Sequence, residues 1–574
     1  MKLPIKRTLI AAVIGALLAG GSGIFLYEFN IGQGLIHNSY ATQIVGRGDI
    51  GATEAVVVFI DELSYKELDQ PLNAAWDRRL HARLIDRLTA AGAKAIVFDV
   101  VFTDPNTNNP AVDQELARAM EASGRVVLGI DVVWIGAKSK MGMPPFDLLL
   151  DRMAAAGSVE LAADHDLVVR HLYTQDKGLN LPTLAWATAE FLQAKPTQNP
   201  TFPHNDYWLN YYGAPGVLPS VSYHKALDAS AVTDQFFRGK VVFVGSRLLT
   251  KFANERKDEY VHPFGYWLSQ TLLGQRGTKF IAGVEIQATS FLNLVRGDWL
   301  TRGSRATERW IIAVFGLSCG FVLVYLRPIL STLTAAAVLV FALVIIQSIF
   351  LTKLIWFPWL IIAVQIGFAL AWSIVFNSVQ FYVQKRVYEH TLGLYLSPKL
   401  VKRFSRNSKL LKPGAEEHVI TIVFTDIADF TNMSQQISTE QLATLMNNYF
   451  QVAVTKCIHP TDGTVVKYIG DAIFAFWNAP EEQPDHQVRA CQAALHFRAC
   501  EPPSVNGQPL RTRIGIHTGV ARVGNFGSED RVDYTALGES VNLASRLEGL
   551  NKYLGTETLI SGDTKAGIGD KLVT

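Results

Sequence analysis

Two stretches near the C-terminal end decide the fold of this part of the chain, and each carries an aspartate after an apolar run. The first reads Val-Phe-Thr-Asp-Ile-Ala-Asp-Phe-Thr (423–431), and the second reads Lys-Tyr-Ile-Gly-Asp-Ala-Ile-Phe-Ala-Phe-Trp (467–477). In the second, Gly470-Asp471 separates two runs rich in β-branched and aromatic residues, a pattern that predicts a tight hairpin turn. We therefore expect Asp426 and Asp471 at the ends of neighbouring strands.

Two carboxylates at neighbouring strand ends, with backbone carbonyls beside them, suit a hard divalent cation such as Mg²⁺. Aspartate is also common in turns, so a pair of solvated turn residues is the alternative. A second strand, predicted at residues 511–519, begins with arginines. A helix then follows, for which Ser540 is the expected N-cap. Asn542 and Arg546 are four residues apart and share one face of this helix.

Four motifs make the region from about Glu417 to the end resemble the catalytic domain of class III nucleotidyl cyclases. They are Phe-Thr-Asp-Ile-x-x-Phe (424–430), Lys-x-x-Gly-Asp (467–471), Arg-x-Gly-Ile-His-x-Gly (513–519) and Gly-x-x-Val-Asn-x-Ala-x-Arg (538–546). They occur in the order that the family has. The resemblance implies an α+β ferredoxin-like catalytic domain that cyclises a nucleoside triphosphate and releases pyrophosphate.

The resemblance also implies the roles of individual residues. Asp426 and Asp471, with the carbonyl of Ile427, would hold two metal ions, Mg²⁺ or Mn²⁺, in each site. Asn542 would orient the ribose, and Arg546 would stabilise charge at the reacting phosphate. The residues expected to contact the substrate are Lys467, Thr535, Arg513, which would contact the phosphate tail, Phe430 and Thr431.

The base-selecting pair of the family maps to Lys467 and Thr535. A lysine can donate a hydrogen bond to N1 of adenine but opposes the N1–H of guanine, and guanylyl cyclases usually have an acidic residue there. The chain therefore looks like an adenylyl cyclase, a phosphorus–oxygen lyase that uses ATP. Threonine replaces the aspartate of many family members at the second position, which leaves guanine preference as an alternative.

In this family the metal-binding aspartates come from one subunit, while Lys467, Thr535, Asn542 and Arg546 come from the other. A chain with one catalytic domain then implies a homodimer with two equivalent sites, and a two-fold dimer is also the commonest symmetry. The chain stops at residues 571–574, where the family usually adds strands and a Lys-Gly-Lys stretch that contacts phosphates. This departure keeps open a catalytically weak receptor that binds nucleotide and signals by dimerisation.

Four apolar runs are long enough to cross a membrane: residues 8–27, 310–326, 329–351 and 354–376. The cationic start of the chain and Lys399, Lys402 and Arg403 after the last run place both ends in the cytoplasm. A cleaved signal peptide is the alternative for the first run. With 49% hydrophobic residues and a net charge of +2, the composition fits a membrane protein and shows no stripe for nucleic acid.

Between the first and second apolar runs, the composition predicts a globular α/β domain. Strands are expected at residues 56–60, 95–98 and 240–245, with a helix at 79–91 between the first two. Strand–helix–strand implies that the first two strands form a parallel pair. Asp61 and Asp99 follow these two strands. They either line a pocket at the strand carboxyl ends or only cap helices and turns.

Four motifs in this domain resemble an extracytoplasmic CHASE sensor of the second subtype. They are Ile-Asp-Glu-x-Ser (60–64), Arg-x-x-His-Ala-Arg-Leu-Ile (78–85), Phe-Asp-Val-Val-Phe (98–102) and Gly-Lys-Val-Val-Phe-Val-Gly-Ser (239–246). The resemblance implies that the domain senses an unknown signal outside the cytoplasm. Together with the cyclase motifs, it implies a multi-pass protein of the bacterial inner (plasma) membrane, with the sensor in the periplasm or outside the cell.

The predicted fold is a multi-domain membrane protein with an α/β sensor, four transmembrane helices and an α+β catalytic domain. The expected parts are a cytoplasmic tail and first span (1–27), the sensor (28–308), three spans (309–377), a helical linker (378–414) and the cyclase domain (415–574). In the linker, Phe376, Val379, Val383 and Val387 recur at nearly heptad spacing. They predict a helix that pairs with its twin, or a continuation of the last span, up to a break at Tyr395-Leu-Ser-Pro398.

Overall fold

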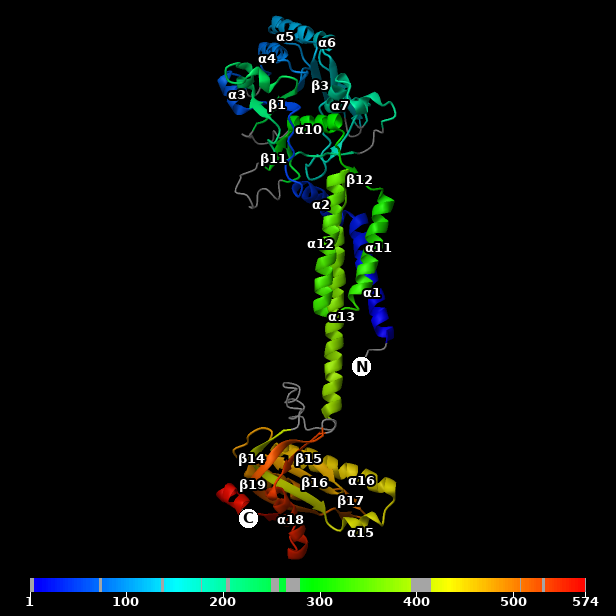
Figure 1. Ribbon diagram of the computed structural model, residues 1–574, viewed down its shortest axis with the longest axis vertical. Coiled ribbons are helices and arrows are strands. Elements are labelled where there is room, and N and C mark those ends of the chain that lie inside the picture. The colour runs from blue at the N-terminus through cyan, green and yellow to red at the C-terminus, as the bar shows by residue number, and fades with distance from the viewer. Residues whose placement is uncertain are drawn as a thin grey trace. The chain divides into compact units, whose positions relative to one another are not determined.

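The computed structural model divides into two compact units, Met1–Ser378 and Val379–Thr574, and each is described by itself (Figure 1). The residues described are 5–71, 75–135, 139–176, 178–202, 207–248, 258–264, 279–393, 414–505, 507–528 and 532–572. Lys399, Lys402, Arg403 and the helix break expected at 395–398 lie outside these ranges.

The first unit contains a 7-stranded sheet in the order β4-β3-β2-β9-β1-β8, with β5 beside β3. Its strands are β1 (Ala55–Ile60), β2 (Ala95–Val101), β3 (Val126–Ile135), β4 (Ser139–Met143), β5 (Ala155–Ser158), β8 (Ser220–Ser222) and β9 (Val241–Ser246). Every pairing is parallel except that of β3 with β4. The three strands predicted from the sequence are confirmed. The expected pairing of the first two is wrong, because β9 lies between β1 and β2.

Helices cover both faces of this sheet. They are α2 (Gln33–Val45), α3 (Glu62–Glu67), α4 (Arg78–Ala90), α5 (Pro110–Ser123), α6 (Asp147–Leu150), α7 (Leu184–Phe191), α8 (Tyr223–Leu227) and α10 (Gly283–Arg296). One hydrophobic cluster joins α4 and α5 to one face, and another joins α7 and α10 to the opposite face. Strands covered on both sides are apolar throughout, which explains the unbroken apolar run of β1.

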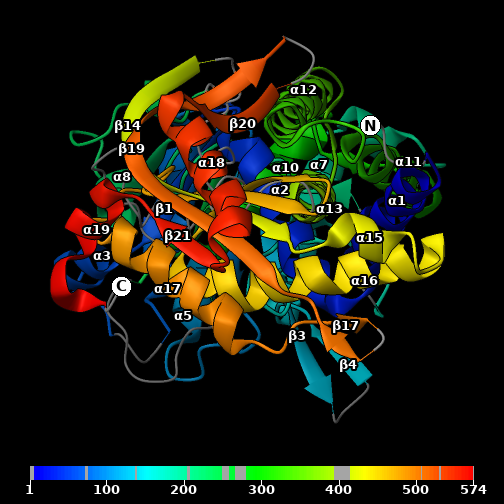
Figure 2. The same ribbon diagram turned by 90° about the horizontal axis from the view of Figure 1, so that it is seen from below.

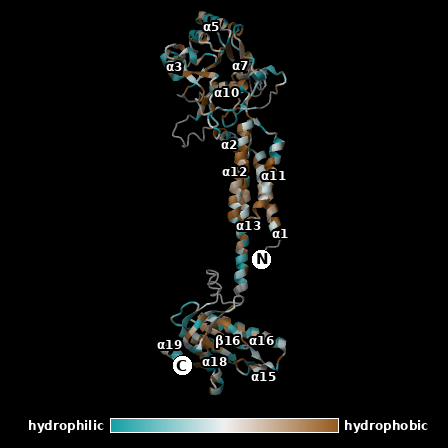
Figure 3. Ribbon diagram, in the orientation of Figure 1, coloured by the Kyte–Doolittle hydropathy of each residue, from teal (hydrophilic) through white to brown (hydrophobic). Residues whose placement is uncertain are grey.

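Four helices are long and apolar enough to cross a membrane, as predicted, and Figure 3 shows their hydrophobic colouring. They are α1 (Ile5–Glu28), α11 (Arg305–Leu323), α12 (Pro328–Lys353) and α13 (Trp359–Gly393). Glycines bring α1 and α11 together: a Cβ atom on Gly320 would lie 2.2 Å from the carbonyl oxygen of Gly15. Small residues at such a contact let membrane helices pack closely. The last span continues as one helix to Gly393.

The ends of the apolar helices are connected to the α/β domain by polar contacts. Glu308 in the first turn of α11 is buried, and it accepts a hydrogen bond of 2.7 Å from the Tyr27 hydroxyl at the end of α1. Arg302 on β12 (Thr301–Arg302) forms an ion pair of 2.8 Å with the same carboxylate. β12 in turn pairs with β13 (Ile355–Trp356), which lies between α12 and α13. The apolar helices and the α/β domain therefore share one polar junction.

Three short two-stranded pairs complete the first unit. They are β6 (His171–Leu172) with β7 (Tyr207–Trp208), β10 (Glu259–Val261) with β11 (Phe280–Ala282), and β12 with β13. The hydrophobic cluster under α7 and α10 extends from these segments to Ile312, Phe350 and Trp356 at the ends of the spans. The hydrophobic core of the α/β domain is thus continuous with the ends of the four apolar helices.

The second unit is built on a 6-stranded sheet in the order β15-β16-β14-β19-β20, with β21 beside β19. Its strands are β14 (Gly414–Ile427), β15 (Thr464–Ile469), β16 (Ala472–Trp477), β19 (Thr512–Gly527), β20 (Val532–Leu537) and β21 (Thr558–Ile560). A short pair, β17 (Ser504–Val505) and β18 (Gln508–Pro509), precedes β19. The central order β15-β16-β14-β19, with helices after β14 and β16, is the predicted ferredoxin-like arrangement.

Helices cover the two faces of this second sheet unequally (Figure 2). They are α15 (Phe430–Ser434), α16 (Thr439–Val452), α17 (His486–Ala499), α18 (Glu539–Leu554) and α19 (Gly562–Ile568). α16, α17 and α19 share one hydrophobic cluster with the sheet, and α18 packs on the other face through Ala544. The prediction that Ser540 is the N-cap of this helix is wrong. The helix is preceded by Gly538, and the Ser540 hydroxyl donates to the carbonyl of Val520 at 2.8 Å.

The glycine of the third cyclase-like motif holds α18 against the sheet. A Cβ atom on Gly515 would lie 2.2 Å from the backbone nitrogen of Glu548 and 2.4 Å from the backbone oxygen of Ala544. Backbone atoms cannot move aside as a flexible side chain can. Only glycine at this position therefore allows the observed approach of helix and strand.

We expect Gly515→Ala to lower the free energy of unfolding by about 1–3 kcal/mol, the usual cost of overpacking. Amide hydrogens of α18 in the full-length protein in detergent should then exchange faster, as mass spectrometry would measure. The matched control is Gly549→Ala, in α18 itself, where an added Cβ atom meets nothing within 4 Å. Alanine there should stabilise the helix by about 0.5–1 kcal/mol. Equal exchange in the two variants would contradict the packing role of Gly515.

Candidate active site

The two aspartates singled out from the sequence lie at the same end of adjacent strands. β14 and β16 are antiparallel neighbours, with Thr425 opposite Ile473. Gly470 has φ +66° in the two-residue turn between β15 and β16, so the predicted hairpin is confirmed. Asp471 follows it, and its Oδ2 accepts a hydrogen bond of 3.3 Å from the backbone N–H of Ile427. The turn thus brings Asp471 beside the end of β14.

Arg513 lies directly opposite Asp426 in the pairing of β14 with β19. Its Nη2 atom donates to Oδ2 of Asp426 at 2.8 Å. Both side chains are largely buried, with 17% of the arginine and 28% of the aspartate exposed. The arginine that the sequence pattern assigned to the phosphate tail is therefore also the direct partner of a predicted metal ligand.

The pKa of Asp426 reflects its burial and its closeness to Asp471. Burial raises the pKa of Asp426 to about 6, and the charge of Asp471 and a hydrogen bond with it add to the effect. Arg513 acts in the opposite direction without cancelling it. Like charges that share a site repel, and the group that cannot ionise freely is the one with the raised pKa. A cation at this position would relieve the repulsion.

Glu548 is a third carboxylate at this site, and reasoning from the sequence missed it. It lies on α18, with its Oε1 atom 3.7 Å from Nε of Arg513. Burial raises its pKa to about 7, and the nearby charge of Asp426 contributes. Glu548 follows Arg546 by two residues, on a helix that the sequence already indicated as part of the site. This position could have marked it as a candidate site residue. The structure therefore joins three carboxylates and one guanidinium.

The other residues predicted for the site lie elsewhere on the domain. Lys467 on β15 and Asn542 and Arg546 on α18 are exposed, and Thr535 on β20 is buried. Within the described ranges, no hydrogen bond or ion pair connects these four to Asp426 or Asp471. Phe430 begins α15 and packs against the core under α16, and Thr431 beside it is exposed. One copy of the chain thus assembles the acidic half of the predicted site.

The residues present fit divalent cations. Asp426 and Asp471 offer carboxylate oxygens, the ligands that Mg²⁺ and Mn²⁺ prefer, at strand ends where the backbone of Ile427 is also at hand. Burial, and then the charge of Asp471, raise the pKa of Asp426, and a cation between the two carboxylates would favour their ionised forms.

The strand-end aspartates of the sensor differ from each other. Asp61 caps α3, since its Oδ1 atom accepts from the backbone N–H of Ser64 at 2.9 Å. Its Oδ2 atom accepts from the hydroxyl of Ser222. The helix-cap alternative is thus correct for Asp61. The pocket alternative is correct for Asp99, which lines a cavity of about 450 Å³.

Comparison with known families matches two parts of the chain. Residues 8–325 match the model of the CHASE2 domain, and this segment is more than half of the 574 residues. Residues 414–565 match the adenylate and guanylate cyclase catalytic domain. The second match includes the sheet, α18 and every residue predicted for the site.

Individual relatives match the C-terminal part. Adenylate cyclase 1 of Rhizobium meliloti is 39% identical over 180 residues, which are 30% of this chain and 27% of the relative. An adenylate cyclase of Anabaena cylindrica is 35% identical over 153 residues, 26% of this chain and 30% of the relative. The chain thus spans less than a third of these curated relatives. The crystal structure of the adenylyl cyclase CyaB from P. aeruginosa is 32% identical, with 28% of this chain and 85% of that chain covered and a TM-score of 0.24.

Proposed function

The chain belongs to the CHASE2 family and carries an adenylate and guanylate cyclase catalytic domain, and from this premise we propose that it is a membrane-bound adenylyl cyclase. It converts ATP into 3′,5′-cyclic AMP and pyrophosphate, under the control of the sensor. The observation that carries the proposal is the pairing of Asp426 and Asp471 at adjacent strand ends, with Arg513 bound to the first. Phosphoryl-type transfer needs this kind of positioned charge more than covalent chemistry.

Asp426, Asp471 and the carbonyl of Ile427 would hold two Mg²⁺ or Mn²⁺ ions, and such ions would activate the ribose hydroxyl and neutralise charge on the phosphates. Arg513 is held by Asp426 and contacts the phosphate tail of the nucleotide. Asn542 and Arg546 lie on α18 with exposed side chains, which are accessible to a substrate. Arg546 stabilises the charge that develops at the reacting phosphate, and Asn542 orients the ribose.

The adenine base is selected by Lys467 and Thr535. Lys467 is exposed on β15, where its ammonium group can donate to N1 of adenine. Thr535 is buried on β20 and offers a hydroxyl that both donates and accepts. Phe430 positions the start of α15, and Thr431 lies beside it at the edge of the site.

We expect purified protein with Mg²⁺ or Mn²⁺ to form cyclic AMP from ATP faster than cyclic GMP from GTP. Lys467→Glu should lower kcat/KM for ATP by roughly tenfold to hundredfold, the value of a hydrogen bond from a charged group. The control is Lys456→Glu, which changes an exposed lysine outside the predicted site. It should leave kcat/KM for ATP unchanged. Faster turnover of GTP would make the chain a guanylyl cyclase. Bound nucleotide without any product would support the receptor alternative.

A homodimer completes the site. Asn542, Arg546 and Lys467 are exposed in a single chain, and within the described ranges they form no hydrogen bond or ion pair with the two aspartates. Exposed apolar side chains accompany them, such as Leu543 on α18 and Tyr468 and Ile469 at the hairpin. Apolar surface beside functional polar groups supports a protein interface at this place. Two copies related by two-fold symmetry then form two equivalent sites.

The four apolar helices would cross the bacterial inner membrane, with the sensor in the periplasm and the catalytic domain in the cytoplasm. The junction of Tyr27, Arg302 and Glu308 supports control by the sensor, because it joins two spans to β12 of the sensor through one buried carboxylate. The helix α13 contains the last span and continues without a break to Gly393, in the part of the chain that precedes the cyclase domain. A change in the sensor can therefore reach the membrane helices through packed contacts.

A further inference from the structure

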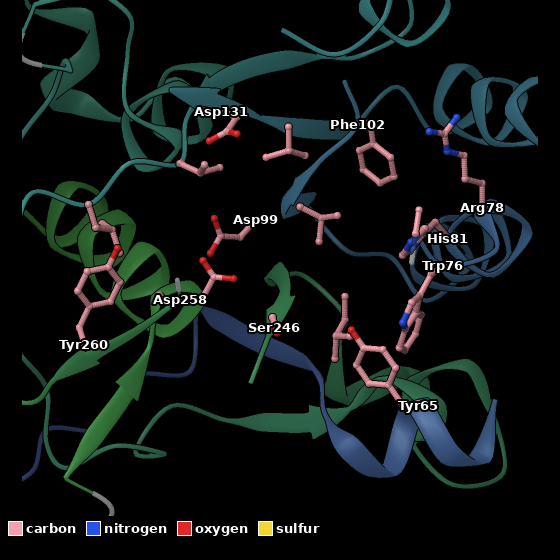
Figure 4. A pocket seen from close by; sticks show the side chains of 17 residues that line it. Tyr65, Trp76, Arg78, His81, Asp99, Phe102, Asp131, Ser246, Asp258 and Tyr260 are labelled. Atoms are coloured by element: carbon pink, nitrogen blue, oxygen red, sulfur yellow. The ribbon is translucent and has the colours of Figure 1, made fainter. Parts of the chain in front are cut away.

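A cavity of about 450 Å³ lies in the sensor at the carboxyl ends of the parallel strands β1, β2 and β9 (Figure 4). The strands reach it through Ile60, Asp99 and Ser246, and α10 approaches it with Gly283 at its first position. Open α/β sheets bind their ligands at this edge. The volume is within the range of sites for small molecules, about 300–1,000 Å³.

The two ends of the cavity differ in chemistry. Three carboxyl groups, those of Asp99, Asp131 and Asp258, gather at one end in Figure 4. The aromatic rings of Trp76 and Phe102 line the other end. A molecule that fills the cavity therefore meets carboxyl groups at one end and aromatic surface at the other.

The cationic side chain beside the aromatic end is already neutralised. Arg78 is buried, and its guanidinium forms an ion pair with the buried carboxylate of Asp113 and donates to the carbonyl of Asp104. It also stacks over the ring of Phe146 at 5.0 Å. Its charge is therefore bound in the wall of the cavity.

His81 does not supply positive charge either. Burial lowers its pKa to about 4, with a smaller contribution from Arg78, so the imidazole is neutral. One ring nitrogen lies 2.8 Å from the hydroxyl of Tyr223. Arg78 is thus already paired and His81 is neutral, so neither offers a free positive charge to the carboxyl groups at the acidic end.

Asp99 is the carboxylate with the least compensation. Protein surrounds it on nearly all sides, and what remains accessible of its side chain faces the cavity. Within the described ranges, no hydrogen bond or ion pair reaches its oxygens. Burial raises its pKa to about 8, and the charge of Asp258 adds to the effect. Buried polar groups normally have partners, so a missing partner indicates a ligand.

A bare metal ion does not fit this acidic end. One group of three acidic or imidazole side chains in the described ranges has ligand atoms within 4.8 Å of one another, and it consists of His37, Asp164 and Asp166. The three aspartates of the cavity do not meet that spacing. A molecule with its charge on an organic group can satisfy carboxylates that are further apart.

We propose that this cavity binds a small organic amine. Its ammonium group lies between Asp99 and Asp131, and its apolar body lies against Trp76 and Phe102. Burial of apolar groups against aromatic rings is favourable because it removes both surfaces from water. The proposal does not depend on the nucleotide that the cyclase domain uses, because it concerns binding to the sensor alone.

The test is isothermal titration calorimetry of the full-length protein in detergent with phenethylamine, putrescine and choline. The uncharged counterparts phenethyl alcohol, butanediol and dimethylbutanol have nearly the same shape. We expect at least one amine to bind and its uncharged counterpart not to bind. Binding of none of the three amines, or equal binding of an amine and its counterpart, would overturn the proposal.

Asp99→Asn keeps the shape of the side chain and removes its charge. It should weaken the binding of the amine by about thirtyfold, the effect of removing one partner of a buried charge pair. Asp131→Asn should also weaken it, and this second variant keeps the test decisive if the first does not fold. Asp86→Asn removes the same charge from an exposed position on α4 and should leave binding unchanged. Equal affinity of Asp99→Asn, Asp131→Asn and Asp86→Asn would refute the assigned contact.

Discussion

Asp471→Asn is expected to lower the rate of cyclic nucleotide formation by about 10²–10³-fold, with little change in folding. The substitution keeps the shape of the side chain and the acceptor for the N–H of Ile427, but it removes the charge that would hold the metal ions. Without that charge, repulsion no longer raises the pKa of Asp426, and the site loses its affinity for a divalent cation. The measurement is initial rates with saturating ATP across a range of Mg²⁺ concentrations.

The matched control is Asp533→Asn, which removes the same charge from an exposed position on β20. This variant should keep the activity of the parent protein. The thermal unfolding midpoints of the two variants should be similar, since neither aspartate is part of the hydrophobic core. Parent-like activity of Asp471→Asn would exclude a role for this carboxylate in metal binding.

Co-expression of Asp471→Asn with Arg546→Ala should restore activity to about a quarter of that of the parent protein, although each variant alone is nearly inactive. Random pairing makes half of the dimers mixed, and each mixed dimer keeps one intact site out of two. The reason is the division of the site: the aspartates of one chain work with α18 of the other. The measurement is cyclic AMP formation by membranes that contain both chains in equal amounts.

Co-expression of Asp426→Asn with Asp471→Asn is the control for this experiment. Both substitutions damage the acidic half, so every site in a mixed dimer lacks one aspartate and no activity should return. Restored activity in this control would show that the recovery does not depend on combining the aspartates of one chain with α18 of the other. No recovery with Asp471→Asn and Arg546→Ala would mean that each chain forms its own complete site.

The hairpin that carries Asp471 could be predicted because its signals are local. A two-residue turn with glycine in a left-handed conformation and two flanking apolar runs lie within residues 464–477. The four apolar helices were predictable for the same reason, since length and composition decide whether a segment suits a membrane. In both cases the interacting groups are close together in the chain.

The contacts of Arg513 and Glu548 could not be predicted from the sequence and became visible only in the tertiary structure. Arg513 lies opposite Asp426, 87 residues earlier in the chain, only because β14 and β19 pair in one particular register. Glu548 approaches them because α18 crosses the sheet at Gly515. The motifs identified the residues, but their mutual distances depend on how helix and strands pack.

Asp61 and Asp99 show most clearly what the sequence by itself determined. The sequence predicted both strands. Asp61 directly follows β1, whereas Asp99 lies within β2, which continues to Val101 beyond the predicted end at residue 98. Only the tertiary structure decided their roles. Asp61 accepts hydrogen bonds from the first turn of α3 and from Ser222, which is 161 residues away. Asp99 instead lines a cavity between segments that are far apart in the chain. Local patterns determine strands, turns and spans, because neighbouring residues form them. The partners of a buried charge depend on long-range packing, which such patterns do not encode.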